Sequence, residues 1–311
     1  MKFIQAKDFY FLAVIALMKV VDWSSLPRLK DYIVRGIALT AYQLSRNKRR
    51  LSRINLSRTL SEGLSERQKR SIIKEAFSVF WEDVFSLSLS RRERATLKGV
   101  EISGVEYLQS ALGNRKGVIL WESSYFGKRN LAKHILHENG FALYQVHTER
   151  HLGGFSAGNG AATWVRRYIA KPFFERREQQ FVTEIIYLPD SDSLVFTRRL
   201  LALLRQNVIV CITGDEGFGH KLISQPFLGH TKLFATGMVS LAKTSGVSIL
   251  PMFCVQEPGS EIRLIVERPI RIDTGIEREQ GLENSIAEYV GLLESRIRRY
   301  PEQYRSWHHI D

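Results

Sequence analysis

Apolar and polar residues follow two different periods along the chain, and the change lies near residue 100. Beyond that point, short apolar runs of strand length alternate with longer amphipathic segments of helical length. The predicted strands cover 117–121, 141–147, 184–188, 207–214, 247–255 and 262–270. The predicted helices cover 128–138, 163–180, 192–205, 235–245 and 282–299. This succession predicts an α/β fold in which helices flank a mostly parallel sheet.

The segment before residue 100 has helical spacing throughout. Residues 9–18, FYFLAVIALM, form a run of ten apolar residues that ends at Lys19. A membrane-spanning helix needs about 20 apolar residues, and no small-residue cleavage site marks a secretory signal. We therefore expect residues 1–99 to be a helical part whose first two helices lie in a membrane interface, or alternatively pack on the domain. Residues 100–311 are expected to form the α/β domain, and the two parts to be one structural unit.

The charge of the chain is strongly basic, although its composition is otherwise ordinary for a folded protein. The net charge is +13 over 311 residues, and residues 26–100 hold 17 Lys and Arg against 7 Asp and Glu. Segment 46–58 alone places six basic residues in thirteen positions. Such a field suits a phosphate-rich or acidic partner, such as nucleic acid, an anionic membrane or an acidic carrier protein. Nucleic acid is disfavoured because the basic stretches lack interleaved aromatic residues or a reading motif.

Several common chemical signatures are missing from the sequence. It has no P-loop and no G-x-S-x-G elbow, and the glycine-rich loop at 153–160 does not sit between a strand and a helix. His134 and His137 lie three positions apart without a carboxylate at matching spacing, so a surface pair is expected and no metal site. Cys211 and Cys254 lie in apolar strand-like runs, which predicts buried free thiols in a reducing compartment.

Polar residues that carry chemistry gather after two predicted strands. In ILWESSYFGKRN, residues 119–130, an apolar run stops at a polar cluster, and Phe126-Gly127 turns the chain into a helix that begins near Lys128. Asp215 and Glu216 follow the strand at 207–214. Because the carboxyl ends of parallel strands line the cleft of an open α/β sheet, these residues are expected to share one site.

The chain resembles a known family in several separate stretches. The matching residues are Asp215 to Gly217, Pro226 to Gly229, Thr236-Gly237, Leu241-Ala242, Pro251 and Tyr300 to His308. Together with the basic helical entry, they resemble the late acyltransferases of lipid A biosynthesis, within the lysophospholipid acyltransferase superfamily. The likeness runs from about residue 45 to the end; the C-terminal tail and the PFLG-to-LA block are its specific parts.

The resemblance implies a reaction, a compartment and partners. The expected reaction transfers a fatty acyl group from an acyl-carrier-protein or coenzyme-A thioester to a lipid or glycolipid hydroxyl. The thioester is the donor substrate, and no cofactor is implied. The expected place is the cytoplasmic face of a bacterial inner membrane, where the protein would contact anionic lipids.

The catalytic motif of that family is altered in this chain. Family members carry a His and, after four intervening residues, an Asp or Glu, in a stretch like H-F-G-x-x-E. The same frame here runs from Tyr125 to Asn130, so the spacing is kept while both functional groups are changed. Acyl transfer to a hydroxyl needs a base near neutral pKa and an acid that orients it. Tyrosine has an ordinary pKa of about 10, and asparagine carries no charge.

Two hypotheses follow from the altered motif. In the first, a substitute base acts: His147 at the end of the neighbouring strand is the leading candidate, Glu122 is second, and Asp215 lies close in the inferred topology. Oxyanion stabilisation by the helix N-terminus at Lys128 would assist. In the second, the cleft binds an acyl chain or headgroup without chemistry.

Both hypotheses place the same residues around the substrate. The residues expected to contact it are Ser124, Phe126, Gly127, Lys128, Arg129, Asp215 and Glu216. Tyr125 and Asn130 are expected to face one another across the turn, at the cleft mouth.

Overall fold

A computed structural model defines most of the chain. It describes residues 4–24, 27–60, 63–148, 151–152, 155–156, 163–188, 194–217, 221–259, 261–273 and 278–310. The glycines of the loop expected at 153–160 lie outside these residues.

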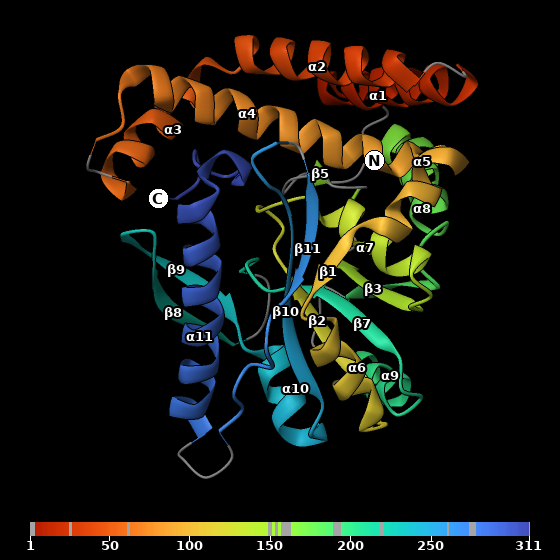
Figure 1. Ribbon diagram of the computed structural model, residues 1–311, viewed down its shortest axis with the longest axis vertical. Helices are drawn as coiled ribbons and strands as arrows, with labels where there is room; N and C mark the ends of the chain where they lie inside the picture. Colours follow the sequence, from red (N-terminus) through yellow and green to blue (C-terminus); the bar gives the residue numbers. More distant parts are fainter. Residues whose placement is uncertain are drawn as a thin grey trace.

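A seven-stranded sheet forms the centre of the fold, in the order β1-β11-β10-β2-β7-β3-β6 (Figure 1). Its strands are β1 (Glu101–Ser103), β2 (Val118–Glu122), β3 (Leu143–Thr148), β6 (Glu184–Leu188), β7 (Ile209–Thr213), β10 (Ser248–Gln256) and β11 (Ile262–Val266). Every neighbouring pair is parallel except β10 and β11, which follow one another directly in the chain. The predicted α/β fold with a mostly parallel sheet is confirmed.

Two small antiparallel pairs stand outside this sheet. They are β4 (His151–Leu152) with β5 (Phe155–Ser156), and β8 (Leu222–Phe227) with β9 (His230–Ala235). The β8–β9 hairpin lies beside the last helix, α11 (Figure 1). The sequence patterns predicted neither this hairpin nor the short strand β1.

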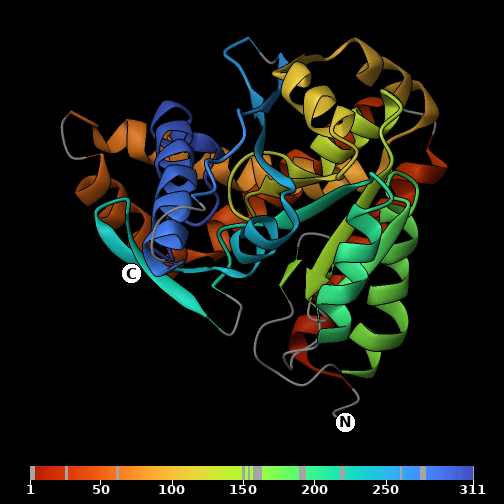
Figure 2. The ribbon, with the colours of Figure 1, turned by 90° about the horizontal axis from the view of Figure 1, so that it is seen from below.

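The helices cover both faces of the sheet. They are α1 (Ala6–Trp23), α2 (Pro27–Leu44), α3 (Arg46–Thr59), α4 (Glu66–Phe85), α5 (Arg91–Thr96), α6 (Val105–Gly113), α7 (Arg129–Glu138), α8 (Lys171–Glu178), α9 (Leu194–Leu204), α10 (Gly237–Ser245) and α11 (Arg278–Arg299). Short turns are η1 (Ser86–Ser88), η2 (Leu97–Gly99), η4 (Pro301–Gln303) and a π-helical turn, η3 (Arg166–Ala170), that runs into α8. Figure 2 shows the sheet between these helical layers.

Alternation along the strands divides the core into two layers. In β2, Ile119 and Trp121 join the layer under α9, α10 and α11, whereas Val118 and Leu120 join the layer under α1, α6, α7 and α8. Both layers are apolar because a central parallel strand is covered on both faces. Trp121 stacks on Tyr289 of α11 at 4.3 Å between ring centroids. The apolar run of β2 is therefore buried along its whole length, and this packing fixes the position of the carboxyl end of the strand.

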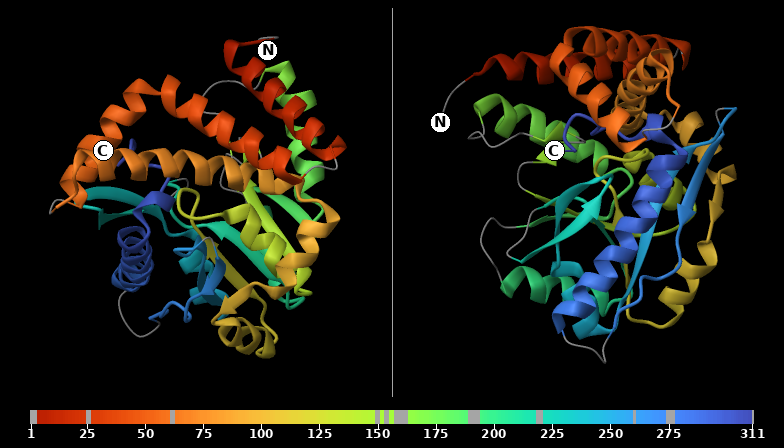
Figure 3. Two further views of the ribbon diagram at one scale, coloured as in Figure 1. Left: turned by 45° about the horizontal axis from the view of Figure 1, so that its top comes forward. Right: turned by 90° about the vertical axis from the view of Figure 1, so that its left-hand side faces the viewer.

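The N-terminal helices form an outer layer over α4 (Figure 3). Buried residues of α1, among them Phe11 and Met18, belong to the same apolar layer as the sheet. A buried ion pair between Arg166 Nε and Asp8 Oδ1, 2.9 Å apart, fixes α1 to η3. On the outer side, Phe9 and Trp23 are 64% and 89% exposed. Within the described residues, no helix is long and apolar enough to cross a bilayer.

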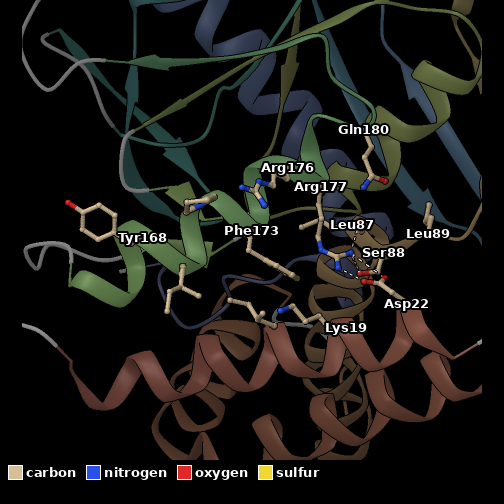
Figure 4. A pocket seen from close by; sticks show the side chains of 13 residues that line it. Lys19, Asp22, Leu87, Ser88, Leu89, Tyr168, Phe173, Arg176, Arg177 and Gln180 are labelled. Atoms are coloured by element: carbon tan, nitrogen blue, oxygen red, sulfur yellow. Dashed lines mark hydrogen bonds and ion pairs between the residues drawn. The ribbon is translucent and has the colours of Figure 1, made fainter.

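A groove of about 520 Å³ lies where α1 meets η1 and α8 (Figure 4). Arg177 closes this junction: its guanidinium donates to Ser88 Oγ at 2.7 Å, pairs with Asp22 of α1, and lies over the Phe173 ring at 4.4 Å. Lys19 on α1 lines the same groove. The junction therefore holds α1 against α8, which also carries a residue of the site described next.

Candidate active site

A cavity of about 470 Å³ opens beside the carboxyl ends of β3 and β7, beneath α9 and α10. Most of its lining is apolar: Trp121, Val146, Leu188, Phe196, Leu200, Leu201, Ile212, Ala235, Met238 and Leu241. Charged and titratable side chains join this lining from the strand ends and from α7, namely His147, Glu216 and Arg129, with Lys221 from the position just before β8. An apolar cavity with a few polar groups is the usual form of a small-molecule site.

The turn after β2 is held from inside by Asp215. Its carboxylate accepts hydrogen bonds from the Ser123 hydroxyl and from the Ser124 N–H, the latter at 2.7 Å. The Ser123 oxygen in turn accepts from the N–H groups of Tyr125 and Phe126 at 3.1 and 3.0 Å. Asp215 is 1% exposed, and each of its carboxylate oxygens accepts one of these hydrogen bonds, so its role is to hold the turn in place.

Gly127 is required by the path of the chain at this turn. Its φ is +68°, and a Cβ built there would lie 2.3 Å from the carbonyl oxygen of Cys254. A side chain is therefore excluded both by backbone conformation and by space. Phe126, beside it, is buried in the core at an edge-on contact with Phe253. The two residues expected to touch substrate thus belong to the scaffold of the turn.

The C-terminal tail holds the turn from outside. Phe126 forms an isolated β-bridge with Tyr304. The N–H of Arg305 donates to the Tyr125 carbonyl, and Arg305 Nη2 donates to the Ser124 carbonyl, both at 2.7 Å. The tail, which the sequence marked only by resemblance, therefore fixes the geometry of the turn.

The side chains of Tyr125 and Asn130, the two positions of the resemblance-based motif frame, have different surroundings. Asn130 is fully buried; its N–H donates to Asp83 Oδ1 at 2.8 Å and its side-chain amide donates to the Asp83 carbonyl at 3.2 Å. Tyr125 is half-buried beneath the Lys232 ammonium, which lies 5.2 Å from its ring centroid. Burial, with Asp215 second, raises the pKa of Tyr125. The expectation that Asn130 lies at an open cleft mouth opposite Tyr125 is wrong, because Asp83 holds it in the interior.

The N-terminus of α7 is already occupied. The Leu131 N–H also faces Asp83 Oδ1, at 3.4 Å, and the Lys128 N–H donates to the Cys254 carbonyl at 2.9 Å. The Lys128 ammonium pairs with Glu82 at 2.6 Å. Since the Asp83 carboxylate accepts from the N–H groups of Asn130 and Leu131, these groups are not available to an oxyanion. The expected oxyanion role of this helix end is therefore wrong, and Lys128 has a structural partner.

A buried ion cluster surrounds His147. His147 Nε2 lies 2.9 and 2.8 Å from the two carboxylate oxygens of Glu178 on α8. The Lys133 ammonium donates to Glu178 at 3.1 Å and to Gln145 at 2.8 Å, and lies 3.9 Å from Glu122. Burial lowers the pKa of His147 to about 4, against the opposing pull of Glu178. His147 lines the cavity, whereas Glu122 is buried on the Lys133 side and does not.

Ser124, Arg129 and Glu216 meet at the edge of the cavity. The Ser124 hydroxyl donates to Glu216 Oε1 at 2.5 Å, and Arg129 Nη1 lies 3.5 Å from the same hydroxyl oxygen. Burial raises the pKa of the Glu216 carboxyl. The pKa of Arg129 is also raised, because nearby carboxylates, Glu122 first, outweigh its burial. Of the residues expected to contact the substrate, four lie together in the structure: Ser124, Arg129, Asp215 and Glu216.

The family follows from a comparison of the whole chain. A family model described as bacterial lipid A biosynthesis acyltransferase matches residues 2–309. The chain belongs to this family. The resemblance seen in the sequence is therefore confirmed, and it reaches further toward the N-terminus than expected. Among curated proteins, none matches the chain in a sequence comparison.

Several residues that shape this acyltransferase-family site were not predicted from the sequence patterns. Glu178 and Lys133 lie inside amphipathic helices, where a charged residue looks like part of a solvated face. Asp83 and Arg305 come from α4 and the tail, 47 residues before and 175 residues after the position of Asn130. Their long-range contacts leave no local signal. The one available hint was a charged residue at an apolar-face position, as for Asp83 between Trp81 and Phe85.

Both cysteines and one histidine of the expected surface pair are buried. Cys211 and Cys254 are buried free thiols, as predicted, and burial raises the pKa of both. The expected surface pair is wrong for His134, which is 1% exposed and packs against Phe181 at 3.8 Å between ring centroids. Across the described part of the chain, no cluster of three or more His, Cys, Asp or Glu residues is arranged to hold a metal ion.

Proposed function

We propose that the protein transfers a fatty acyl group from an acyl thioester to a hydroxyl of a lipid or glycolipid. Membership of the acyltransferase family supports the reaction class. The observation that carries the proposal is the cavity of about 470 Å³, whose apolar lining suits an acyl chain. Glu216 and Arg129 border it beside the family's active-site turn, so a thioester carbonyl held there meets both a carboxylate and a cation.

We further propose that the reaction takes place at the cytoplasmic face of a bacterial inner membrane. The strongly basic residues 26–100 and the exposed apolar side chains of α1 support contact with anionic lipids. The same positive charge suits an acidic acyl-carrier protein as the carrier of the donor thioester. A coenzyme-A thioester is the alternative donor. The proposal includes no metal, no further cofactor and no nucleic-acid partner.

The direct test is acyl transfer by the purified full chain in detergent. Acyl thioesters labelled in the acyl group, on coenzyme A and on acyl-carrier protein, are incubated with an under-acylated lipid A precursor. Label should pass to the lipid, and a Leu200→Trp variant should transfer long chains poorly because Leu200 lines the cavity. No labelled lipid with either donor would count against the proposal.

A second candidate function is binding without catalysis, and the altered motif favours it. By the resemblance, Tyr125 and Asn130 stand at the positions of the family dyad, and Asn130 donates its side-chain amide to the Asp83 carbonyl. A glutamate at position 130 would lose this donor and bring a carboxylate to the Asp83 carbonyl oxygen instead. Restoring the dyad by Tyr125→His with Asn130→Glu is therefore expected to strain the site. The binder hypothesis holds if the wild type binds acyl thioester and Leu200→Trp weakens that binding, while no transfer occurs.

A further inference from the structure

Two of the residues considered as the base are held away from an incoming hydroxyl. Both carboxylate oxygens of Glu178 contact His147 Nε2, so this ring nitrogen is engaged within the buried cluster. The pKa of His147, lowered to about 4 by burial, makes the imidazole a weak base. Glu122 is 1% exposed and does not line the cavity. Neither side chain presents a strong free base to the cavity.

Asp215 and Tyr125 are unsuited for other reasons. The oxygens of Asp215 accept hydrogen bonds from Ser123 and Ser124, and breaking them would release the turn. Tyr125 stays protonated at neutral pH, because burial and the Asp215 carboxylate raise its pKa. A protonated phenol cannot accept the hydroxyl proton.

Glu216 has the access that the others lack. It lies three residues after the end of β7, is partly buried, and lines the cavity next to Thr213 and Arg129. Its hydrogen bond from the Ser124 hydroxyl, at 2.5 Å, marks a place where a second hydroxyl can bind. From this geometry we propose, resting on the proposed function, that Glu216 is the general base that takes the proton of the acceptor hydroxyl.

The electrostatic surroundings of Glu216 suit this role. Burial raises the pKa of its carboxyl, and the neighbouring Asp215 adds to the rise. The Ser124 hydrogen bond and the Arg129 charge act in the opposite direction and keep the carboxylate ionisable. A base works best when its pKa lies near the working pH, so a carboxyl raised from its ordinary range is a better base than a fully exposed one.

The proposed step balances without any further reactant. The acceptor hydroxyl replaces the Ser124 hydroxyl at Glu216 Oε1, and its oxygen attacks the thioester carbonyl carbon as Glu216 takes its proton. A C–O bond forms and the C–S bond breaks. The departing thiolate then takes the proton from Glu216, which restores the carboxylate. Arg129, whose guanidinium lies 3.5 Å from the Ser124 hydroxyl oxygen, stabilises the negative charge that develops on the carbonyl oxygen.

The experiment compares Glu216→Gln and Ser124→Ala with a matched control in the full chain. The probes are lauroyl-coenzyme A and lauroyl-acyl-carrier protein as donors, with an under-acylated lipid A precursor as acceptor. Glu106→Gln is the control, since Glu106 is exposed on α6 and has no ion pair or hydrogen bond within the described residues. Glu216→Gln should lower turnover about 10²–10⁴-fold and remove the acid limb of kcat/KM. The control should keep the wild-type turnover, and Ser124→Ala should lower turnover by far less than Glu216→Gln does. Circular dichroism and the variant Glu216→Asp, which retains a displaced carboxylate and part of the activity, separate misfolding from loss of the base.

Each outcome decides the assignment. If the wild type transfers acyl groups and Glu216→Gln does so equally well, another residue is the base and the proposed function stands. If Ser124→Ala is as inactive as Glu216→Gln, the serine hydroxyl itself takes part in the bond-making step and our assignment is overturned. If the wild type stays silent with both donors, the proposed function fails and the base assignment with it.

Discussion

Replacing Lys133 by methionine is the sharpest test of the buried cluster beside the candidate site. The Lys133 side chain is 0% exposed, and its ammonium contacts the Glu178 carboxylate at 3.1 Å and the Gln145 side chain at 2.8 Å. Glu122, 3.9 Å away, receives no hydrogen bond at either carboxylate oxygen from the described residues. Lys133→Met keeps a chain of similar length but removes the cation that contacts Glu178 and lies near Glu122.

The expected loss follows from the cost of breaking a buried ion pair. Removing one partner of such a pair costs about 3–5 kcal/mol, because the remaining charge is uncompensated. Methionine fills most of the space, so little of the loss comes from a cavity. The double variant Lys133→Met with Glu178→Gln should lose less than the sum of the two single changes, since one carboxylate is then neutral.

Urea unfolding followed by tryptophan fluorescence measures these free energies. Lys98→Met is the matched control: Lys98 is exposed in η2, and such a change is expected to stay within about 0.5 kcal/mol. A difference between Lys133→Met and Lys98→Met of less than about 1 kcal/mol would refute the reasoning, since a broken buried pair costs several times more. It would mean that other groups, such as the Arg129 guanidinium, already compensate the two carboxylates.

Four further results are expected. If Glu216 is the base, His147→Ala should lower turnover by less than about tenfold while lipid binding survives, and a loss of about 10²–10⁴-fold would return the base role to His147. Leu200→Trp should shift donor preference toward shorter acyl chains, because it fills the cavity; a variant with unchanged preference over a series of chain lengths would show that the chain binds elsewhere. The unfolding free energy should fall as pH drops from 6.5 toward about 4, because the folded chain keeps His147 neutral while the unfolded chain protonates it; the loss for His147 is about 3 kcal/mol. His134→Gln should make the same pH profile less steep, because the folded chain also keeps His134 neutral. An unchanged slope in this variant would contradict the burial of His134 as a neutral ring. Vesicle sedimentation should detect binding to anionic vesicles that weakens in high salt, and equal, salt-insensitive binding to neutral vesicles would remove the electrostatic part of the membrane proposal.

Local patterns in the sequence determined the elements and the turn. Runs of apolar residues predicted the sheet strands β2, β3, β6, β7, β10 and β11, because a strand covered on both faces must be apolar along its length. Ser65 and Gln68 form the start of α4 through a reciprocal capping box, a contact between residues three positions apart. The Phe126-Gly127 turn was readable for the same reason, as its glycine is dictated by backbone conformation at one position.

Only the tertiary structure decided which side chains meet at the end of β2. The sequence placed Tyr125 and Asn130 in one frame, but Asp83 from α4 draws Asn130 into the interior, while Tyr125 packs under Lys232. Spacing along the chain sets how far apart two residues can lie along the backbone. The direction of each side chain depends instead on contacts with residues that are distant in the sequence. The parallel pairing of β2 and β7 sets Glu122 beside Thr213, so Ser124 and Glu216, 92 positions apart, meet where both strands end.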